Sequence, residues 1–226
     1  MITPKDQMLG AIRHGLQRAV LPGAEATLTR MARAASADPQ ALVRQFEQAL
    51  LALTGHVHHA ASAGEAADVI AAVVAEHGAK TFLSWDGGEL GCDGLLDALA
   101  ARALTRVTYD LAFDATQRAA EVPGLGEVVL GLTGSDGALA DAGAIVLASG
   151  PGRGRLASLL PPVHVALVSA SRIHGTLPDL LAARPDLVGR GANLVVIAGP
   201  SRTADIEMTL THGVHGPKHL HVILTP

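Results

Sequence analysis

The densest group of chemically active side chains lies near the carboxyl end of the chain, between residues 199 and 217. An apolar run at residues 194–198 ends at Gly199-Pro200, and polar residues follow at once. These are Ser201, Arg202, Thr203, Asp205 and Glu207, with His215 in the next turn. Open α/β sheets place ligand-binding groups in loops at the ends of buried strands. The pattern therefore predicts a ligand site after a buried strand at 194–198.

The first three of these residues suit the binding of a small anion. Arg202 is a natural partner for a carboxylate or phosphate, and Ser201 and Thr203 add hydroxyl groups. If a helix follows the turn, either hydroxyl also caps it, and the amino terminus of that helix favours negative charge. Simple helix capping explains the same residues, so both interpretations stay open.

The remaining three residues are the candidates for acid–base catalysis. His215 is the natural proton carrier near neutral pH, and Glu207 and Asp205 are the candidate carboxylates. The two acids are two positions apart, so on a helix they point to different sides and form no pair. Ordinary first-turn acids are the alternative interpretation of these carboxylates.

Two further loops are predicted to contribute to substrate binding. One places Asp136 and Asp141 between two predicted strands, where turn and capping chemistry is the alternative. The other is a glycine-rich basic loop at 149–155 that contains Gly152 and Arg153. It matches neither the dinucleotide-binding fingerprint nor the P-loop. An ordinary basic loop is therefore the alternative to a phosphate cradle.

Histidine is abundant, with 11 residues, and it is grouped around positions 56–59 and 212–221. Strand-borne His56 and His58 would share a face, as would His219 and His221. The chain lacks a zinc signature of the H-E-x-x-H or paired-cysteine type, so no metal site is predicted. Cys92 is the single cysteine, whereas an iron–sulfur cluster needs about four thiolates. We therefore expect no cluster in this chain.

Composition excludes several classes of partner. The net charge is −4 and aromatic residues make up 2%, which argues against a nucleic-acid surface or a base-stacking platform. Hydrophobic residues make up 49%, enough for a substantial core. No secretory signal and no apolar run long enough to span a bilayer is visible, so we expect a cytoplasmic protein.

Alternating strand and helix patterns predict an α/β fold with a mainly parallel sheet for residues 55–226, preceded by a helical extension at residues 1–54. The predicted helices cover residues 3–20, 39–53, 63–77, 95–103, 114–120 and 177–183, with a helical turn at 135–142. The predicted strands cover residues 56–60, 81–85, 105–109, 127–132, 144–148, 163–169, 194–198 and 220–224. Asp38 is expected to cap the second helix, and Ser62 with Glu65 forms a capping box.

Several of these stretches together resemble the LUD-domain family, in particular its lactate-utilisation protein C branch. They are GSD (134–136), ADAGAIV (140–146), HVALV (164–168), GPSRTADIE (199–207), GVHGP (213–217) and LHV (220–222). The resemblance covers roughly residues 55–226. It implies a three-layer α/β/α fold similar to the glucosamine-6-phosphate isomerase, ribose-5-phosphate isomerase and CoA-transferase group.

The resemblance also implies a subunit that takes part in oxidising L-lactate to pyruvate together with iron–sulfur partner proteins. A small anionic substrate would then bind at the strand-end loops. Two alternatives stay open: a non-catalytic scaffold subunit of that complex, and an enzyme of the CoA-transferase or sugar-phosphate isomerase type. The residues do not decide whether the chain is itself an enzyme.

Overall fold

The computed structural model describes residues 3–18, 38–107, 124–191, 193–204, 210–212 and 216–226. The chain divides into two compact units, Met1–Ala32 and Arg33–Pro226. In the first unit the described residues form helix α1 (Pro4–Arg18), as the apolar spacing predicted. At its start Thr3 Oγ1 donates to the Asp6 carboxylate at 2.6 Å, so the first turn is closed by a local hydrogen bond.

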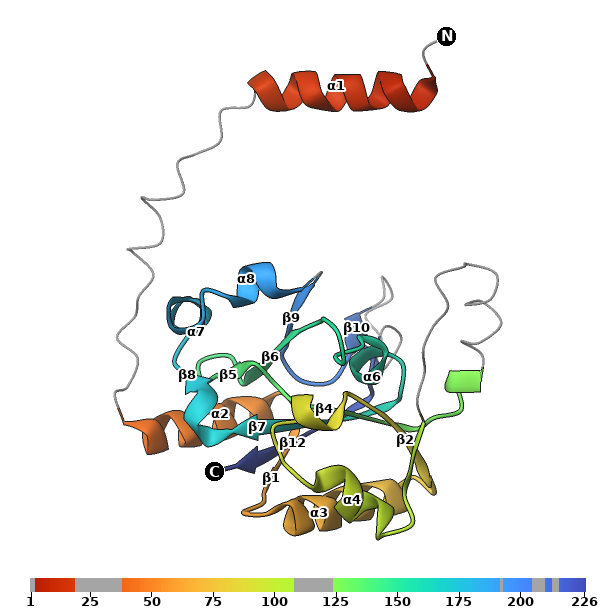
Figure 1. Cartoon of the computed structure of the whole chain (residues 1–226). Coiled ribbons are helices and arrows are strands. Elements are labelled where there is room, and N and C mark those ends of the chain that lie inside the picture. Colours follow the sequence, from red (N-terminus) through yellow and green to blue (C-terminus); the bar gives the residue numbers. More distant parts are fainter. Residues whose placement is uncertain (1–2, 19–37, 108–123, 192, 205–209, 213–215) are drawn as a thin grey trace. The chain divides into compact units, whose positions relative to one another are not determined.

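The second unit is organised around a six-stranded sheet (Figure 1). Its order is β1 (His56–His59), β12 (His219–Thr225), β7 (Val163–Ser169), β4 (Leu130–Thr133), β2 (Thr81–Ser84) and β3 (Thr105–Val107). All neighbouring strands in it are parallel. The central strands are almost continuous apolar runs, as expected of strands buried on both faces. The predicted α/β class with a mainly parallel sheet is therefore confirmed.

Helices cover both faces of this sheet. Figure 1 shows α3 (Ala63–Glu76) and α4 (Leu95–Ala100) together on one side and α6 (Leu156–Leu159) on the other. Gly131 of β4 allows α6 to approach closely, because an added Cβ would lie 1.7 Å from the Ala157 carbonyl oxygen. The sheet is thus the middle layer of three.

Local signals set the starts of two helices where the sequence predicted them. The Asp38 side chain accepts a hydrogen bond from Gln40 N at 3.0 Å at the start of α2 (Pro39–Ala52). The Ser62 hydroxyl accepts from Glu65 N at 3.2 Å at the start of α3. Helix α2 buries Phe46 and Leu50 completely in the same core as the sheet.

A second sheet of four strands differs from the prediction. Its order is β8 (Ile173–His174), β5 (Gly137–Leu139), β6 (Ala144–Ala148) and β9 (Leu194–Ile197), and β6 is antiparallel to both neighbours. The helical turn predicted at 135–142 is wrong, because this segment forms β5 and a hairpin to β6. A strand is present near the predicted position 194–198, but the prediction that it is buried and parallel is wrong. β9 is an antiparallel edge strand, and Val196 is 43% exposed.

The helix expected after Gly199-Pro200 is absent from the described residues. Instead β10 (Arg202–Ala204) pairs antiparallel with β11 (Leu210–His212), with Thr203 opposite Thr211. Helix capping by Ser201 or Thr203 is therefore wrong. Pairing with β11 provides hydrogen-bond partners for the backbone N–H and C=O groups of β10, as a helix would otherwise have done. β-branched threonine also favours the strand conformation. The helix predicted at 114–120 lies outside the described residues.

The other helices with given bounds in the described residues are short. They are α7 (Leu177–Ala183), as predicted, α8 (Leu187–Arg190) and two 3-10 turns, Gly87–Glu89 and Ala170–Arg172. Within the described ranges, no helix has the length and apolar character that crossing a membrane requires.

Candidate functional site

The predicted site residues fall into separate places in the structure. Asp136, Gly152 and Arg153 come together, whereas Ser201 lines a different cavity. Asp141 is exposed at the other end of β5, where its backbone N–H bonds to Gly175 O at 3.1 Å. Arg202 and Thr203 belong to β10. The three candidate acid–base residues, Asp205, Glu207 and His215, lie outside the described residues.

Asp136 is the centre of a buried ion-pair network. Its Oδ2 accepts from Ala148 N at 2.7 Å, which ties it to β6. Its Oδ1 accepts from Arg153 Nη1 at 2.7 Å and from Arg190 Nη1 at 3.4 Å. Arg153 Nε also donates to Glu89 Oε2 at 2.5 Å. Burial lowers the pKa of Arg153, but its hydrogen bonds to Asp136 and Glu89 outweigh this effect and the pKa is raised.

The glycine-rich loop is held against the end of β2 by the same network. Gly152 has a φ of +70°, and its carbonyl accepts from Asp86 N at 2.8 Å. The Arg153 guanidinium lies 5.2 Å from the centre of the Trp85 ring, a cation–π distance. Trp85 Nε1 donates to Gly154 O at 3.2 Å. In these contacts the polar groups of the loop bond to other residues of the protein. A structural role therefore explains the positions of Arg153 and Asp136.

Ser201 lines a separate cavity of about 240 Å³. We call this the Ser201 cavity; its other lining residues are Ser158, Leu159, His164, Val196, Ile197, Ala198, Gly199, Pro200, Gly216, Pro217 and Leu220. Ser201 N donates to Pro217 O at 2.9 Å, and this bond joins the loop after β9 to the turn before β12. Gly199 supports the loop with a φ of +80°, which a side chain would disfavour.

His164 is the polar group buried deepest in the wall of the Ser201 cavity. Its Nε2 lies 2.9 Å from Thr133 Oγ1, and its Nδ1 has no hydrogen-bond partner among the described residues. Complete burial lowers the pKa of His164 to about 3, so the ring is neutral at pH 7. A buried ring nitrogen without a partner is costly unless a ligand or water bonds to it. The sequence pattern predicted His164 only as part of a strand. A histidine within an apolar run was the available signal of a functional role.

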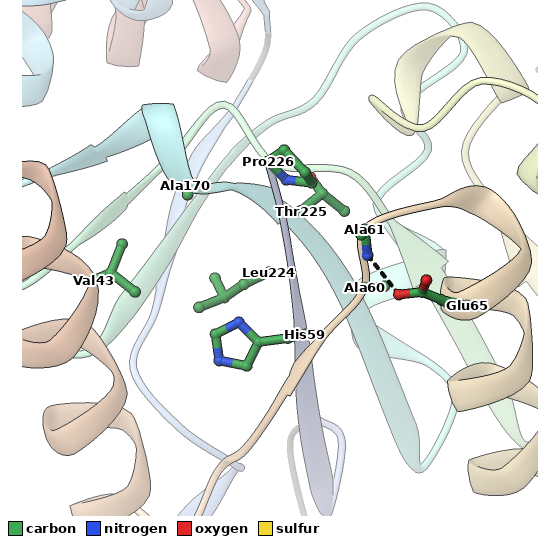
Figure 2. A pocket seen from close by; sticks show the side chains of 9 residues that line it. All are labelled: Val43, His59, Ala60, Ala61, Glu65, Ala170, Leu224, Thr225 and Pro226. Carbon is green, nitrogen blue, oxygen red and sulfur yellow. Dashed lines mark hydrogen bonds between the residues drawn. The ribbon is translucent and has the colours of Figure 1, made fainter.

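A second cavity lies where open α/β sheets usually bind ligands, at the carboxyl ends of β1 and β12. It measures about 330 Å³ and is drawn in Figure 2. The Glu65 carboxylate in its wall accepts from Ala61 N at 2.8 Å, so this carboxylate is already engaged in a local hydrogen bond. His59, also in the wall, lies 2.7 Å from Glu47. The two carboxylates make this cavity less suitable than the Ser201 cavity for an anionic ligand.

Comparison with known proteins places the motifs in a family. The LUD domain matches residues 43–225, most of the chain. A protein named lactate utilization protein C from Geobacillus is 31% identical over 169 residues, which cover 73% of this chain and 70% of the relative. A protein of the same name from Shouchella clausii is 34% identical over 145 residues, covering 62% and 60%.

A solved structure supports the same fold. The crystal structure of a duf162 family protein from Deinococcus radiodurans aligns with a TM-score of 0.60, covering 84% of this chain and 99% of that chain at 23% identity. An identity this low indicates a common fold and carries no information about activity. The family match and the relatives lead to one conclusion: this chain belongs to the LUD domain family.

Proposed function

We propose that this chain is a lactate-utilisation subunit whose Ser201 cavity binds a small carboxylate. One observation carries the proposal. Three stretches that are far apart in the sequence and belong to the family pattern meet in this cavity, namely Gly199–Ser201, Gly216-Pro217 and His164. Its volume is several times the roughly 30 Å³ that one water occupies in the liquid, so a three-carbon acid fits.

The lining explains part of the recognition. Ser201 is half-buried and its hydroxyl makes no hydrogen bond to another described residue, so it is available to a ligand. The neutral His164 ring offers one further polar atom without adding charge. The carboxylate still needs a cation, and Arg202, the next residue after Ser201, is our candidate for a bidentate partner. Thr203 adds a second hydroxyl to the same segment.

The reaction that we propose is the oxidation of L-lactate to pyruvate, carried out together with iron–sulfur partner proteins. Oxidation of lactate to pyruvate releases two protons and two electrons. His215, Glu207 or Asp205 would accept the hydroxyl proton, the proton from Cα would pass to solvent, and both electrons would pass to clusters held by the partner chains. Relatives that carry the name lactate utilization protein C support this pathway. The single cysteine, Cys92, supports the assignment of the clusters to partner chains.

A scaffold role is the second candidate, and one observation favours it. Helix α1 exposes an apolar stripe in which Met8 is 61% exposed and Ile12 is 51% exposed, with Leu9 between them. Amphipathic helices with a stripe of this kind commonly dock on partner proteins. A purely scaffolding chain would have no need for the Ser201 cavity to bind a ligand, so ligand binding separates the two candidates.

The deciding measurement is a calorimetric titration of the purified chain with L-lactate, pyruvate and a sugar phosphate. We expect pyruvate or lactate to bind and Arg202→Ala to weaken binding at least about tenfold, as expected for loss of a charge-assisted pair. Arg13→Ala, which removes the same charge from the exposed face of α1, is the matched control. Absence of binding at millimolar concentration would exclude the substrate site and leave the scaffold role.

A second experiment tests the pathway. Lactate-dependent electron transfer is assayed in a mixture of candidate iron–sulfur partners, with and without this chain. We expect the rate to depend on the chain, and Ser201→Ala to lower it without preventing co-purification with the partners. A rate that is the same without the chain would refute the lactate assignment.

A further inference from the structure

A third cavity lies at the carboxyl edge of the six-stranded sheet. It measures about 210 Å³, and we call it the serine pocket. Its wall comes from the carboxyl ends of β12, β7 and β4 and from the loop after β2, four neighbouring strands of the sheet. The polar side chains in this wall are Ser135, Ser169, Ser171, Arg172 and Thr225. Ligands of open α/β sheets commonly bind beyond the carboxyl ends of adjacent parallel strands.

The serine pocket is separate from the Ser201 cavity. His164 of that cavity is paired with Leu220 near the amino ends of β7 and β12. Ser169 of the serine pocket is paired with Thr225 at the carboxyl ends of the same strands. The two pairs are therefore roughly 16 Å apart along the strands. The proposed lactate chemistry uses no residue of the serine pocket.

Ser135 contributes a polar atom for which the fold provides no partner. The residue is only 9% exposed, and its Oγ is buried without a hydrogen-bond partner among the described residues. A buried hydroxyl of this kind is costly unless a ligand or water bonds to it. Its position in the wall of the pocket therefore points to a polar ligand.

Arg172 adds a positive charge next to this hydroxyl. Its Nη1 donates to the backbone oxygen of Ser135 at 3.3 Å, so the guanidinium lies beside Ser135. The ion pairs of the described residues do not include Arg172. None of the described side chains that line the pocket is acidic. The other N–H groups of Arg172 and the Ser135 hydroxyl can therefore donate to one anionic ligand.

The other hydroxyls differ in how firmly they are engaged. Ser169 Oγ donates to Pro226 O at 2.9 Å and lies 2.7 Å from Ser171 Oγ. Because the first bond uses the single proton of Ser169, Ser171 is the donor in the second. Thr225 Oγ1 donates to Val168 O at 3.5 Å, a long bond that a ligand can replace. Thr225 is thus the third group that can donate to a ligand.

We propose that the serine pocket binds a phosphate group, with Arg172, Ser135 and Thr225 as its donors. These donors belong to the carboxyl ends of three different strands, β7, β4 and β12. A tetrahedral phosphate directs its oxygens to several sides, whereas both oxygens of a carboxylate lie in one plane. Arginine is a common partner of phosphate, because its N–H groups can pair with two oxygens at once.

The test is a calorimetric titration of the full chain with inorganic phosphate and with glycerol 3-phosphate, and acetate is the carboxylate for comparison. The variants are Arg172→Met and Ser135→Ala. The matched control is Arg155→Met, which removes the same charge from an exposed arginine of the glycine-rich loop. Ser201→Ala serves as a second control, because it changes only the Ser201 cavity.

The proposal predicts one equivalent of phosphate per chain and a loss of affinity of about tenfold or more in Arg172→Met, with a smaller loss in Ser135→Ala. Arg155→Met and Ser201→Ala should bind phosphate as wild type does. Ser135→Ala should keep the melting temperature of wild type, because the hydroxyl that it removes has no partner in the described protein. Unfolding would then not explain its weaker binding. Of the two phosphate compounds, the one that binds more tightly identifies the ligand as free phosphate or as a phosphate ester.

Three results would overturn the proposal. They are absence of binding by both phosphate compounds at millimolar concentration, equal affinities in wild type and Arg172→Met, and acetate binding as tight as phosphate binding. Equal losses in Arg172→Met and Arg155→Met would count against it in the same way, because they would indicate a general effect of charge. Lactate binding in the Ser201 cavity is tested with Arg202→Ala, so the two proposals can fail independently.

Discussion

Acid should destabilise the fold through His164, and the size of the effect follows from its burial. The side chain is completely enclosed in β7, and its pKa falls from 6.5 in the unfolded chain to about 3 in the folded protein. A histidine with a lowered folded-state pKa binds fewer protons when folded than when unfolded over the pH range between these values. Stability is therefore fully present above pH 6.5 and is lost progressively as the pH falls towards 3.

The loss of stability between neutral pH and about pH 5 depends little on the exact pKa of His164 in the folded protein. Each pH unit below the unfolded pKa costs about 1.4 kcal/mol as long as the folded ring stays neutral. From about pH 8 to about pH 5 this amounts to roughly 2 kcal/mol for His164 alone. A domain stability of roughly 5–15 kcal/mol makes a change of this size easy to measure.

Urea denaturation of wild type and His164→Asn at both pH values isolates this contribution. Asparagine keeps a side-chain group that can bond to Thr133 Oγ1 but has no proton to gain. The variant should be less stable than wild type at the higher pH, yet it should lose about 2 kcal/mol less on acidification. His14→Asn, on the exposed face of α1, is the control and should behave as wild type. The reasoning is refuted if wild type and His164→Asn lose the same stability between the two pH values.

Two further predictions concern residues outside the Ser201 cavity, in the Asp136 network and in the hairpin between β5 and β6. Arg153→Met leaves Asp136 buried without its nearest cation, so the free energy of unfolding should fall by about 3–5 kcal/mol, whereas Arg184→Met, which removes the partner of the exposed Asp186, should change it much less. Equal losses in urea denaturation would contradict this. Gly143→Ala should lower the melting temperature by several degrees, because Gly143 has a φ of +55° and an added Cβ would lie 2.3 Å from Leu50 N. Gly88→Ala, where a Cβ has no neighbour within 4 Å, is its control, and similar melting temperatures for the two variants would refute the predicted clash.

Local sequence signals predicted much of the fold. The alternation of apolar strands with amphipathic helices predicted the positions of β7 and β12 correctly, because burial on both faces imposes long apolar runs on central parallel strands. The positions of β1, at the edge of the sheet, and of α7 were also predicted correctly. Asp38 and Ser62 marked helix starts correctly, because a capping side chain bonds to backbone groups only two or three residues away. Interactions over two or three residues can therefore be predicted from a short stretch of sequence.

Two of the three errors in the predicted fold have a common cause. The segments at 135–142 and 202–204 have compositions that also suit turns and helix starts, and they form strands because a partner strand lies beside them. For β5 the partner β6 follows closely, and the buried Asp136 carboxylate stabilises the hairpin through Ala148 N. Propensity alone does not contain the position of a partner strand, so tertiary context overrides it.

In the candidate site too, some features follow from the sequence and others only from the tertiary structure. The sequence by itself determined the α/β class, the family motifs and the polar residue Ser201 after β9, because each is encoded in a short stretch. It also placed His56 with His58, and His219 with His221, on common strand faces. Only the tertiary structure brought His164 and Gly216 to Ser201, separated the Asp136 network from that cavity, and joined both histidine pairs in one pocket. The physical reason is that parallel strands far apart in the chain become neighbours only through the order of strands in the sheet.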